Sequence, residues 1–405
     1  MIEYTDGAMQ LGPFATATLA LIVFSVGQWL NKRYTVLRDY NIPEPVTGGL
    51  LFSLLFTLVF FVFGVQVDFQ LMARDVLIVY FFTTIGINSN FQTLLAGGKP
   101  LLILLAATVA YMFLQNLTGV SVASLFGLPA AVGVLGGTAS LIGGHGTTIA
   151  WAPTIAEEFG IENALEIGIA CATTGLILAS LMGGPIAKYL ITKHRLEPAT
   201  TEPLDIGVSF KTEHVTVDHV RFLHALLAVH ISILIGFTAN EALEEAGVKL
   251  PLFVTCLFAG IVLTNTVPYL FPKADWPSRT TSMALIGDIA LGMFLAMSLM
   301  SMQLWTLVDL AGPIIAILGA QFLIAVAFTL LLIFRIMGRD YEAAVVCAGF
   351  GGISLGATPT SIANMTAVTK KYGAAHRAFI IVPLVAAFFI DIVNAFLIRF
   401  FLNNF

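Results

Sequence analysis

Apolar segments of about 20 residues recur along this chain, and they constrain its fold more than any other feature. Of the 405 residues, 58% are hydrophobic and 11% are charged, and the mean hydropathy is +0.92. A helix of this length crosses the hydrocarbon core of a bilayer. We therefore predict an all-α integral membrane protein with ten transmembrane helices. The ten segments are 12–31, 45–67, 73–92, 100–125, 162–187, 222–240, 250–270, 282–302, 312–334 and 378–402.

Two further segments, 130–156 and 343–368, are apolar but are interrupted near the middle by glycines and polar residues. Ten crossings from an outside N-terminus place 16 of the 19 lysines and arginines inside and leave Arg74, Lys249 and Arg399 outside. This positive-inside bias holds only if each interrupted segment returns to the side that it entered. A helical arm of about 10 to 13 residues rises about 15–20 Å, roughly half of the hydrocarbon core. Both segments are therefore predicted to be re-entrant hairpins.

The two halves of the chain repeat each other. At a spacing of 213 residues, nine identities relate 130–160 to 343–373, among them Gly143 with Gly356 and Thr147 with Thr360. Each half contains five predicted spans, so the second half must enter the membrane from the opposite side, as in the inverted repeats of many secondary transporters. Both termini are then periplasmic. The predicted organisation is a first repeat at 1–190 with its hairpin at about 130–156, a cytoplasmic connector at 191–220, and a second repeat at 221–405 with its hairpin at about 343–368.

The two hairpin tips have the composition of a binding site. The first tip is GGHGTT, residues 143–148, and the second lies within GISLGATPTSIAN, residues 352–364. Irregular backbone at the depth of the membrane midplane is tolerated only where protein buries it or where it lines a wet cavity. Helix N-termini at the tips suit a carboxylate, and exposed carbonyls and hydroxyls suit a sodium ion. The alternative is a close contact between helices, for which small residues are common in membranes.

Eleven tip residues are the predicted substrate ligands. Three roles stay open for His145, which are a hydrogen bond to the ligand, binding of a proton, and a hydrogen bond to a tip carbonyl. Asn364 follows the second tip by about one turn, so its side chain can point back toward Thr360. The predicted substrate-binding residues are Gly143, Gly144, His145, Gly146, Thr147, Gly356, Ala357, Thr358, Pro359, Thr360 and Asn364.

Polar residues within or beside the predicted spans are the candidate sodium ligands. Asp391 lies near the middle of the last span, where an unpaired carboxylate is costly to bury, and Asn394 follows on the next turn. A structural hydrogen bond to a neighbouring helix is the alternative for Asp391. Asn116 lies within the fourth span and can contact a hairpin, whereas for Asn88 and Asn90 both solvation and a site role stay open. The sodium candidates are Ser140, Asn116, Ser354, Asp391 and Asn394.

Other kinds of site are not indicated. The three cysteines lie inside apolar segments and are interpreted as packing residues. No catalytic base or set of metal ligands has a recognisable spacing, so neither an enzyme nor a metal site beyond sodium is expected. We also expect no cofactor and no nucleic-acid partner.

Six motifs resemble those of the bacterial sodium/glutamate symporters, in the same order along nearly the whole chain. They are NIPEPVTGGLL (41–51), FFTTIGINSN (81–90), GGHGT (143–147), RDYEAAVVCAG (339–349), GATPTSIANM (356–365) and FFIDIVNA (388–395). The resemblance implies an inner-membrane carrier in which inward sodium movement drives L-glutamate uptake, with lipid around it. It also implies a homodimer that works by an elevator motion.

Two other functions stay open. One is a carrier of similar fold for another small carboxylate or amino acid, coupled to sodium or to protons. The other is a channel, although opposed hairpins without a repeated filter sequence argue against it. No lysine or arginine lies at the centre of a predicted span, so a bound anion would need helix N-termini and co-bound cations for compensation. That is a physical reason for sodium coupling, since the ion and the solute then raise each other's affinity.

Overall fold

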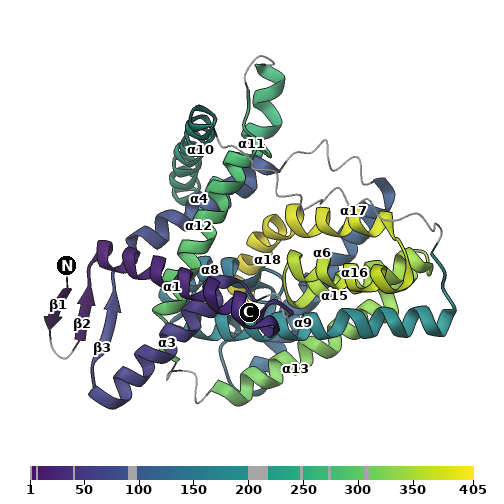
Figure 1. The fold of residues 1–405 in the computed structure, drawn as a ribbon, viewed down its shortest axis with the longest axis horizontal. Coiled ribbons are helices and arrows are strands. Elements are labelled where there is room, and N and C mark those ends of the chain that lie inside the picture. Colours follow the sequence, from purple (N-terminus) through teal and green to yellow (C-terminus); the bar gives the residue numbers. More distant parts are fainter. Residues whose placement is uncertain are drawn as a thin grey trace. The chain divides into compact units, whose positions relative to one another are not determined.

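The computed structural model describes residues 2–5, 8–39, 42–89, 98–198, 218–246, 250–271, 275–304, 306 and 310–405, the side chains of 2–5, 8, 38, 39, 387 and 388 excepted. Helices occupy each of the ten predicted apolar segments (Figure 1). In the first half these are α1 (Pro13–Arg33), α3 (Glu44–Phe63), α4 (Met72–Asn88), α6 (Gly98–Leu125) and α9 (Ala164–His194), with a short α2 (Thr35–Asp39) after α1. In the second half they are α10 (His219–Glu245), α11 (Leu252–Leu270), α12 (Thr281–Met300), α13 (Ala311–Phe328) with its continuation η3 (Thr329–Ile333) and α14 (Phe334–Ile336), and α17 (His376–Leu384), η4 (Val385–Phe389) and α18 (Ile390–Asn404).

Eight helices in the described ranges are long and apolar enough to cross a membrane, which is the architecture of a multi-pass integral membrane protein. The two other predicted spans are not among these eight. The described part of α4 has 17 residues, and the last predicted span consists of α17, η4 and α18. Asn90, at the end of the third predicted span, and residues 199–217 of the predicted connector lie outside the described residues.

A small sheet near the N-terminus was not predicted from the sequence. β1 (Ile2–Thr5) pairs antiparallel with β2 (Ala8–Leu11), and β2 pairs parallel with β3 (Gln66–Phe69). The third strand was missed because its first two residues fall within the predicted span 45–67. α3 ends earlier, at Gly64, whose φ of 66° is the left-handed conformation that glycine adopts at a helix C-terminus.

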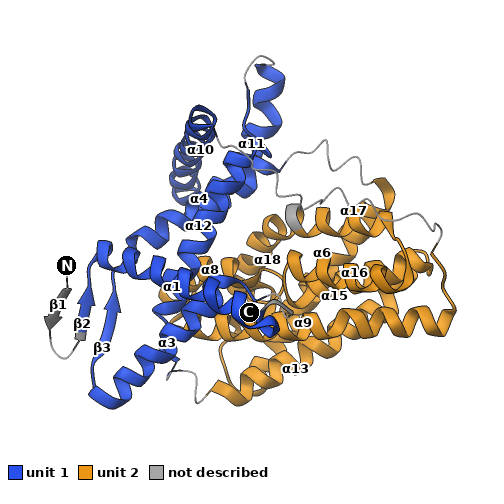
Figure 2. Cartoon of the chain, viewed as in Figure 1, with its two compact units in different colours: residues 1–38, 42–91, 212–306 blue, residues 39–41, 92–211, 307–405 orange. Residues whose placement is uncertain are grey.

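The chain forms two compact units, and each takes helices from both halves of the sequence (Figure 2). Unit 1 comprises Met1–Arg38, Ile42–Phe91 and Thr212–Thr306, and unit 2 comprises Asp39–Asn41, Gln92–Lys211 and Leu307–Phe405. Unit 1 packs α1, α3 and α4 together with α10, α11 and α12. One of its hydrophobic clusters joins Ala20 and Val23 of α1 to Ala296, Met297 and Met300 of α12.

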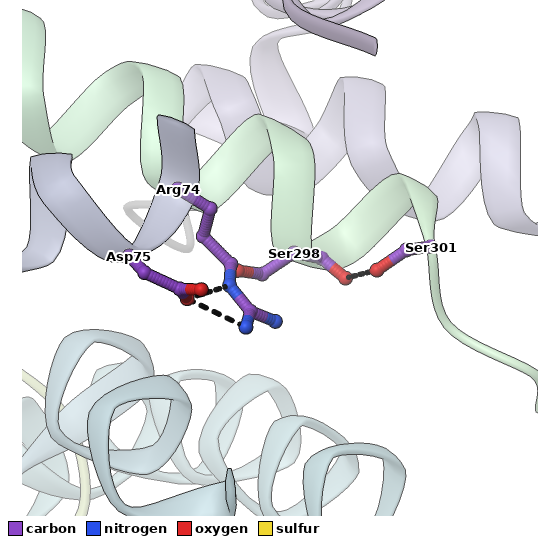
Figure 3. A network of polar contacts seen from close by, with 4 residues as sticks. All are labelled: Arg74, Asp75, Ser298 and Ser301. Atoms are coloured by element: carbon purple, nitrogen blue, oxygen red, sulfur yellow. Dashed lines mark hydrogen bonds and ion pairs between the residues drawn. The ribbon is translucent and has the colours of Figure 1, made fainter. Parts of the chain in front are cut away.

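In unit 1, the charge of Arg74, one of the basic residues that were predicted to face outside, is compensated by a carboxylate. Nε and Nη2 of Arg74 donate to Oδ1 of Asp75 at 2.8 and 2.7 Å, and Figure 3 shows this pair together with the hydrogen bond from the Ser301 hydroxyl to the Ser298 carbonyl oxygen at the end of α12. Further along α4, Asn88 Oδ1 accepts a hydrogen bond from the Arg279 amide at 2.7 Å. Asn88 is therefore a contact between α4 and the loop before α12.

Unit 2 contains two interrupted helical segments and the long helices that pack against them. The first interrupted segment consists of α7 (Ala130–Val134), the π-helical turn η1 (Leu135–Ala139) and α8 (Gly144–Phe159), with a break at 140–143. The second consists of α15 (Tyr341–Leu355) and α16 (Thr358–Tyr372), with a break at 356–357. α15 and α16 lie side by side, and α9 packs against α8, α15 and α16 (Figure 1). The two predicted interruptions of the apolar pattern are therefore real breaks in the helices.

Candidate functional site

The two breaks meet inside unit 2. Gly144, the first residue of α8, has a φ of 70°, which is the left-handed region that favours glycine. A Cβ atom on Gly144 would lie 3.9 Å from the carbonyl oxygen of Gly356, the residue at which α15 ends. The two motifs are 213 residues apart in sequence, yet a single methyl group added at the first turn would reach the second.

Both ends of the second interrupted segment lie together. The Tyr341 hydroxyl, at the start of α15, donates to the carbonyl oxygen of Gly373, just after α16, at 2.6 Å. The carboxylate of Glu342 accepts hydrogen bonds from the backbone N–H groups of Arg377 and Ala378, at 3.2 and 2.9 Å. The start of α15 therefore lies beside the end of α16 and the start of α17.

The first interrupted segment ends at the opposite end of the last helix. Arg399 in α18 forms an ion pair with Glu158 near the end of α8, with Nη1 and Oε2 2.5 Å apart. Along α17, η4 and α18, 22 residues separate Arg377 from Arg399. At 1.5 Å per residue this is a rise of about 33 Å, close to the ~30 Å thickness of a hydrocarbon core.

Two asparagines hold the backbone beside the first break through Thr138. Oδ1 of Asn116 accepts from the amide and the hydroxyl of Thr138, at 2.9 and 3.0 Å. Nδ2 of Asn394 donates to the carbonyl oxygen of Thr138 at 2.9 Å. Thr138 lies in η1, next to the non-helical Gly137, so α6 and α18 supply hydrogen bonds where the helix is distorted. The expected contact between Asn116 and the first interrupted segment is confirmed.

Within GGHGTT, polar side chains form hydrogen bonds inside the turn and to the neighbouring helix α9. The Thr148 hydroxyl lies 3.2 Å from the Ala139 carbonyl oxygen, 3.0 Å from Ser140 Oγ and 2.9 Å from the Gly144 carbonyl oxygen. Nε2 of His145 forms a hydrogen bond with Oγ1 of Thr173 in α9 at 3.0 Å. None of the three roles that the sequence left open for His145 describes this contact, because its partner is a side chain of α9.

The second break has a similar arrangement. The Ser354 carbonyl oxygen accepts from Nε2 of Gln115 in α6 at 2.8 Å, and the Ser354 hydroxyl donates to the Gly351 carbonyl oxygen at 3.2 Å. Nδ2 of Asn364 donates to the carbonyl oxygens of Ala179 and Ala348, at 3.0 and 3.4 Å. The amide of Asn364 therefore attaches α16 to α9 and α15, whereas the Thr360 hydroxyl is not among its hydrogen-bond partners in the described residues.

Several buried polar atoms around the breaks have no protein partner. The hydroxyls of Thr360 and Ser361, in the first turn of α16, are fully buried and have none among the residues that the structure describes. Within the same described ranges, Nδ2 of Asn116 and Oδ1 of Asn394 also lack one. An unsatisfied buried polar group costs about 1–3 kcal/mol, so each of these atoms, two beside the first break and two beside the second, is available to a polar ligand.

The remaining predicted residues are placed as follows. Thr147 is buried, Gly146, Ala357 and Thr358 are half-buried, and Pro359 is exposed at the start of α16. Asp391 is half-buried in the first turn of α18, one turn before Asn394.

Sequence reasoning missed Gln115, Gln321 and Thr173. Nε2 of Gln321 in α13 donates to the carbonyl oxygens of Gln115 and Gly136, at 2.8 and 3.1 Å. Both glutamines are fully buried. Each is an uncharged polar residue in the interior of an apolar span, and that position was the available signal, because such side chains bond across helices in membranes.

Comparison with known proteins gives matches over nearly the whole chain. A family model described as Sodium/glutamate symporter matches residues 9–374. The Sodium/glutamate symporter of Haemophilus influenzae is 38% identical over 392 residues, which cover 95% of this chain and 96% of the relative. The Sodium/glutamate symporter of Escherichia coli (strain K12) is 38% identical over 395 residues, which cover 97% of this chain and 98% of the relative.

Proposed function

We propose that this chain, which belongs to the sodium/glutamate symporter family, binds its solute and its ion in unit 2, beside the two breaks. Its activity is accordingly sodium-coupled symport of glutamate, with sodium as the co-transported ion, and it is a transporter and not an enzyme. The observation that carries this conclusion is the family match, which spans both interrupted segments and the long helices α6, α9 and α13 that precede and follow them.

Glutamate binds between the two breaks. The first turns of α8 and α16 present N–H groups without helical partners and a partial positive charge, which suit the substrate carboxylates. The free hydroxyl of Thr360 and the free Nδ2 of Asn116 are further donors beside the breaks. Asn116 therefore belongs with the substrate in this proposal, because two Thr138 donors already occupy the oxygen that would have to bind sodium.

Sodium binds beside the first break, between Asn394 and Asp391. Oδ1 of Asn394 is a buried acceptor without a partner in the described part of the chain, and oxygen acceptors are what a hard cation prefers. The carboxylate of Asp391, one turn earlier, supplies the negative charge. Ser140 and Ser354, the other candidates, have hydroxyls that take part in hydrogen bonds at the two breaks. We rank them after the first pair for that reason.

Both interrupted segments are re-entrant hairpins within two inverted repeats, and their tips meet from opposite sides of the membrane. Three contacts support this topology: the Tyr341 bond to Gly373, the Arg399 pair with Glu158, and the approach of Gly144 to Gly356. The packing of corresponding helices also agrees with it. α1 packs on α3 as α10 packs on α11, and α3 packs on α12 as α11 packs on α4.

Transport proceeds by alternating access, with unit 2 as the moving part, because both breaks and every proposed ligand belong to it. The protein lies in the inner membrane as a homodimer, with periplasmic termini. Arg74 and Arg399, two of the three basic residues that this orientation leaves outside, each form an ion pair with a carboxylate. The remaining outside residue of the prediction, Lys249, lies outside the described residues.

The function is tested by uptake of labelled glutamate into proteoliposomes that contain the purified protein. An inward sodium gradient should drive saturable uptake, and replacing sodium with choline at constant pH should abolish it. Uptake that is unchanged in choline would overturn sodium coupling. Excess unlabelled dicarboxylates and amino acids in the same assay distinguish glutamate from another small carboxylate as the preferred solute.

A further inference from the structure

Gln115 and Gln321 connect the two breaks through three hydrogen bonds, joined by the Gln115 residue itself, whose side chain bonds one break and whose backbone carbonyl bonds Gln321. Gln115 Nε2 bonds the carbonyl oxygen of Ser354, beside the second break. Gln321 Nε2 bonds the carbonyl oxygen of Gln115 and also that of Gly136, in the turn before the first break. We call these two glutamines, with the carbonyls that they bind, the glutamine relay. It crosses between the halves, because a helix of each half binds the interrupted segment of the other.

The relay supplies donors where the interrupted helices lack them. Ser354 lies in the last turn of α15, whose carbonyl groups have no following helical N–H group to bind. Gly136 lies within the π-helical turn η1, where the regular pairing is disturbed. Each amide orientation is fixed by its contacts, since only the nitrogen can donate to a carbonyl oxygen. The two Oε1 atoms are buried and lack partners among the described residues, so the nitrogen atoms make the connection.

The close packing of α6 allows Gln321 to reach so far. Gly119 of α6 lies one turn after Gln115, and a Cβ there would stand 3.3 Å from Gln321 Nε2 and 2.1 Å from the Gly133 carbonyl oxygen. A larger residue at 119 would therefore push α7 away from α6. Its absence lets α6, α7 and α13 come together where the relay passes.

We propose that the glutamine relay couples the two breaks, so that sodium bound beside the first break raises the affinity of the site for glutamate. This rests on the proposed function. A ligand that orders one break also orders, through the relay, the carbonyl that the other break presents, and the second ligand then pays less of the ordering cost. Gln115 and Gln321 are positioning residues in this scheme, since they act through the carbonyl groups that their Nε2 atoms bind.

The test measures the dissociation constant of glutamate for purified protein at low and at saturating sodium. The ratio of the two constants is the coupling factor, and it does not depend on the amount of active protein. Coupling of this kind is typically roughly 5- to 150-fold. We expect Gln115→Met and Gln321→Met each to lower the factor by at least about threefold. The double variant should lower it no further than the more affected single variant, because both changes interrupt one series of bonds.

Matched controls come from the same helices. Thr108 of α6 and Thr329 of η3 are buried, and each hydroxyl donates only to a carbonyl oxygen of its own helix, at 2.8 and 2.6 Å. Thr108→Val and Thr329→Val should leave the coupling factor unchanged. If a Met variant does not fold, Gln115→Leu and Gln321→Leu also remove the donor without adding a polar group, and they should lower the factor in the same way.

Two results separate failure of the relay from failure of the proposed function. If the unmodified protein binds glutamate equally well with and without sodium, the proposed function is overturned. If the unmodified protein shows coupling and the glutamine variants keep it, only the relay is overturned. A loss of coupling in the threonine controls would also overturn it, because the effect would then be general to buried polar residues of these helices.

Discussion

Asn394 donates a hydrogen bond from Nδ2 to the carbonyl oxygen of Thr138 at 2.9 Å, and this bond joins α18 to the turn before the first break. The two residues are 256 positions apart in sequence. The same carbonyl accepts from the Gly143 amide at 2.9 Å, so Asn394 attaches to the point where the chain turns. Its Oδ1 atom is buried beside that turn and has no hydrogen-bond partner among the described residues.

Asn394→Leu should weaken sodium binding, because it removes the free oxygen and leaves the Thr138 carbonyl with one donor fewer. Loss of an ion ligand of this kind is expected to raise the sodium concentration for half-maximal uptake roughly tenfold, or about 1.4 kcal/mol. Sodium titration of glutamate uptake measures it. Asn404→Leu is the control, since Asn404 is exposed on the same helix and donates only to the Phe400 carbonyl. An equal effect at Asn404 would refute a specific role for Asn394.

Thr360→Val should raise the KM for glutamate and change the maximal rate little. The Thr360 hydroxyl is fully buried without a partner in the described residues, so we expect it to donate to a substrate carboxylate. Such a charge-assisted bond contributes about 1.5–3 kcal/mol, and its loss corresponds to roughly tenfold or more in KM. Thr366→Val is the matched control two turns later, because the Thr366 hydroxyl bonds the Ile362 carbonyl of its own helix. A KM that is unchanged at Thr360 would move the substrate away from α16.

Gly144→Ala should impair transport more than its effect on stability explains. Alanine in the left-handed region costs about 1–2 kcal/mol. Gly160 has a φ of 69° and open space around it, so an alanine there would be strained to the same degree but away from the breaks. We expect similar falls in thermal stability for Gly144→Ala and Gly160→Ala, but lower uptake per folded molecule for Gly144→Ala alone. Equal uptake in the two variants would mean that the left-handed turn at Gly144 has no function beyond folding.

His145→Ala and Thr173→Val should give the same defect in glutamate uptake if His145 acts by attaching the first break to α9. The two side chains share one hydrogen bond of 3.0 Å. The double variant should then be no worse than either single one, with a coupling energy of about 1 kcal/mol in the cycle. A defect confined to His145→Ala would instead indicate direct contact between His145 and the ligand. Measurement of KM and maximal rate for all three variants decides between the two.

The re-entrant topology is testable with single cysteines. The three native cysteines are buried, and replacing all of them gives a background protein without thiols. Glu157 and Lys371 are exposed near the ends of the two interrupted segments. In intact cells, a membrane-impermeant thiol reagent should label Glu157→Cys and should not label Lys371→Cys until the membrane is opened. Labelling of both residues from outside would contradict opposite orientations of the two hairpins.

The sequence by itself determined that the chain lies in a membrane and where its long helices are, because runs of about 20 apolar residues are a local property of the chain. It also located both breaks, since glycine and polar residues interrupt the apolar pattern at Gly143 and Gly356. The strand at Gln66–Phe69 was lost within an apolar run, because the end of α3 depends on the single left-handed residue Gly64.

Only the tertiary structure decided what each polar side chain binds. Asn364 was expected to point toward its own helix turn, but the carbonyls of Ala179 and Ala348 compete for its amide. Gln115 belongs to none of the motifs, and its role is visible only in the structure, where it bonds Ser354, 239 residues away. A hydrogen bond requires two groups within about 3 Å, and for residues so distant in sequence that proximity is set by the packing of helices. Local pattern therefore specified the helices and their breaks, and packing specified the site between them.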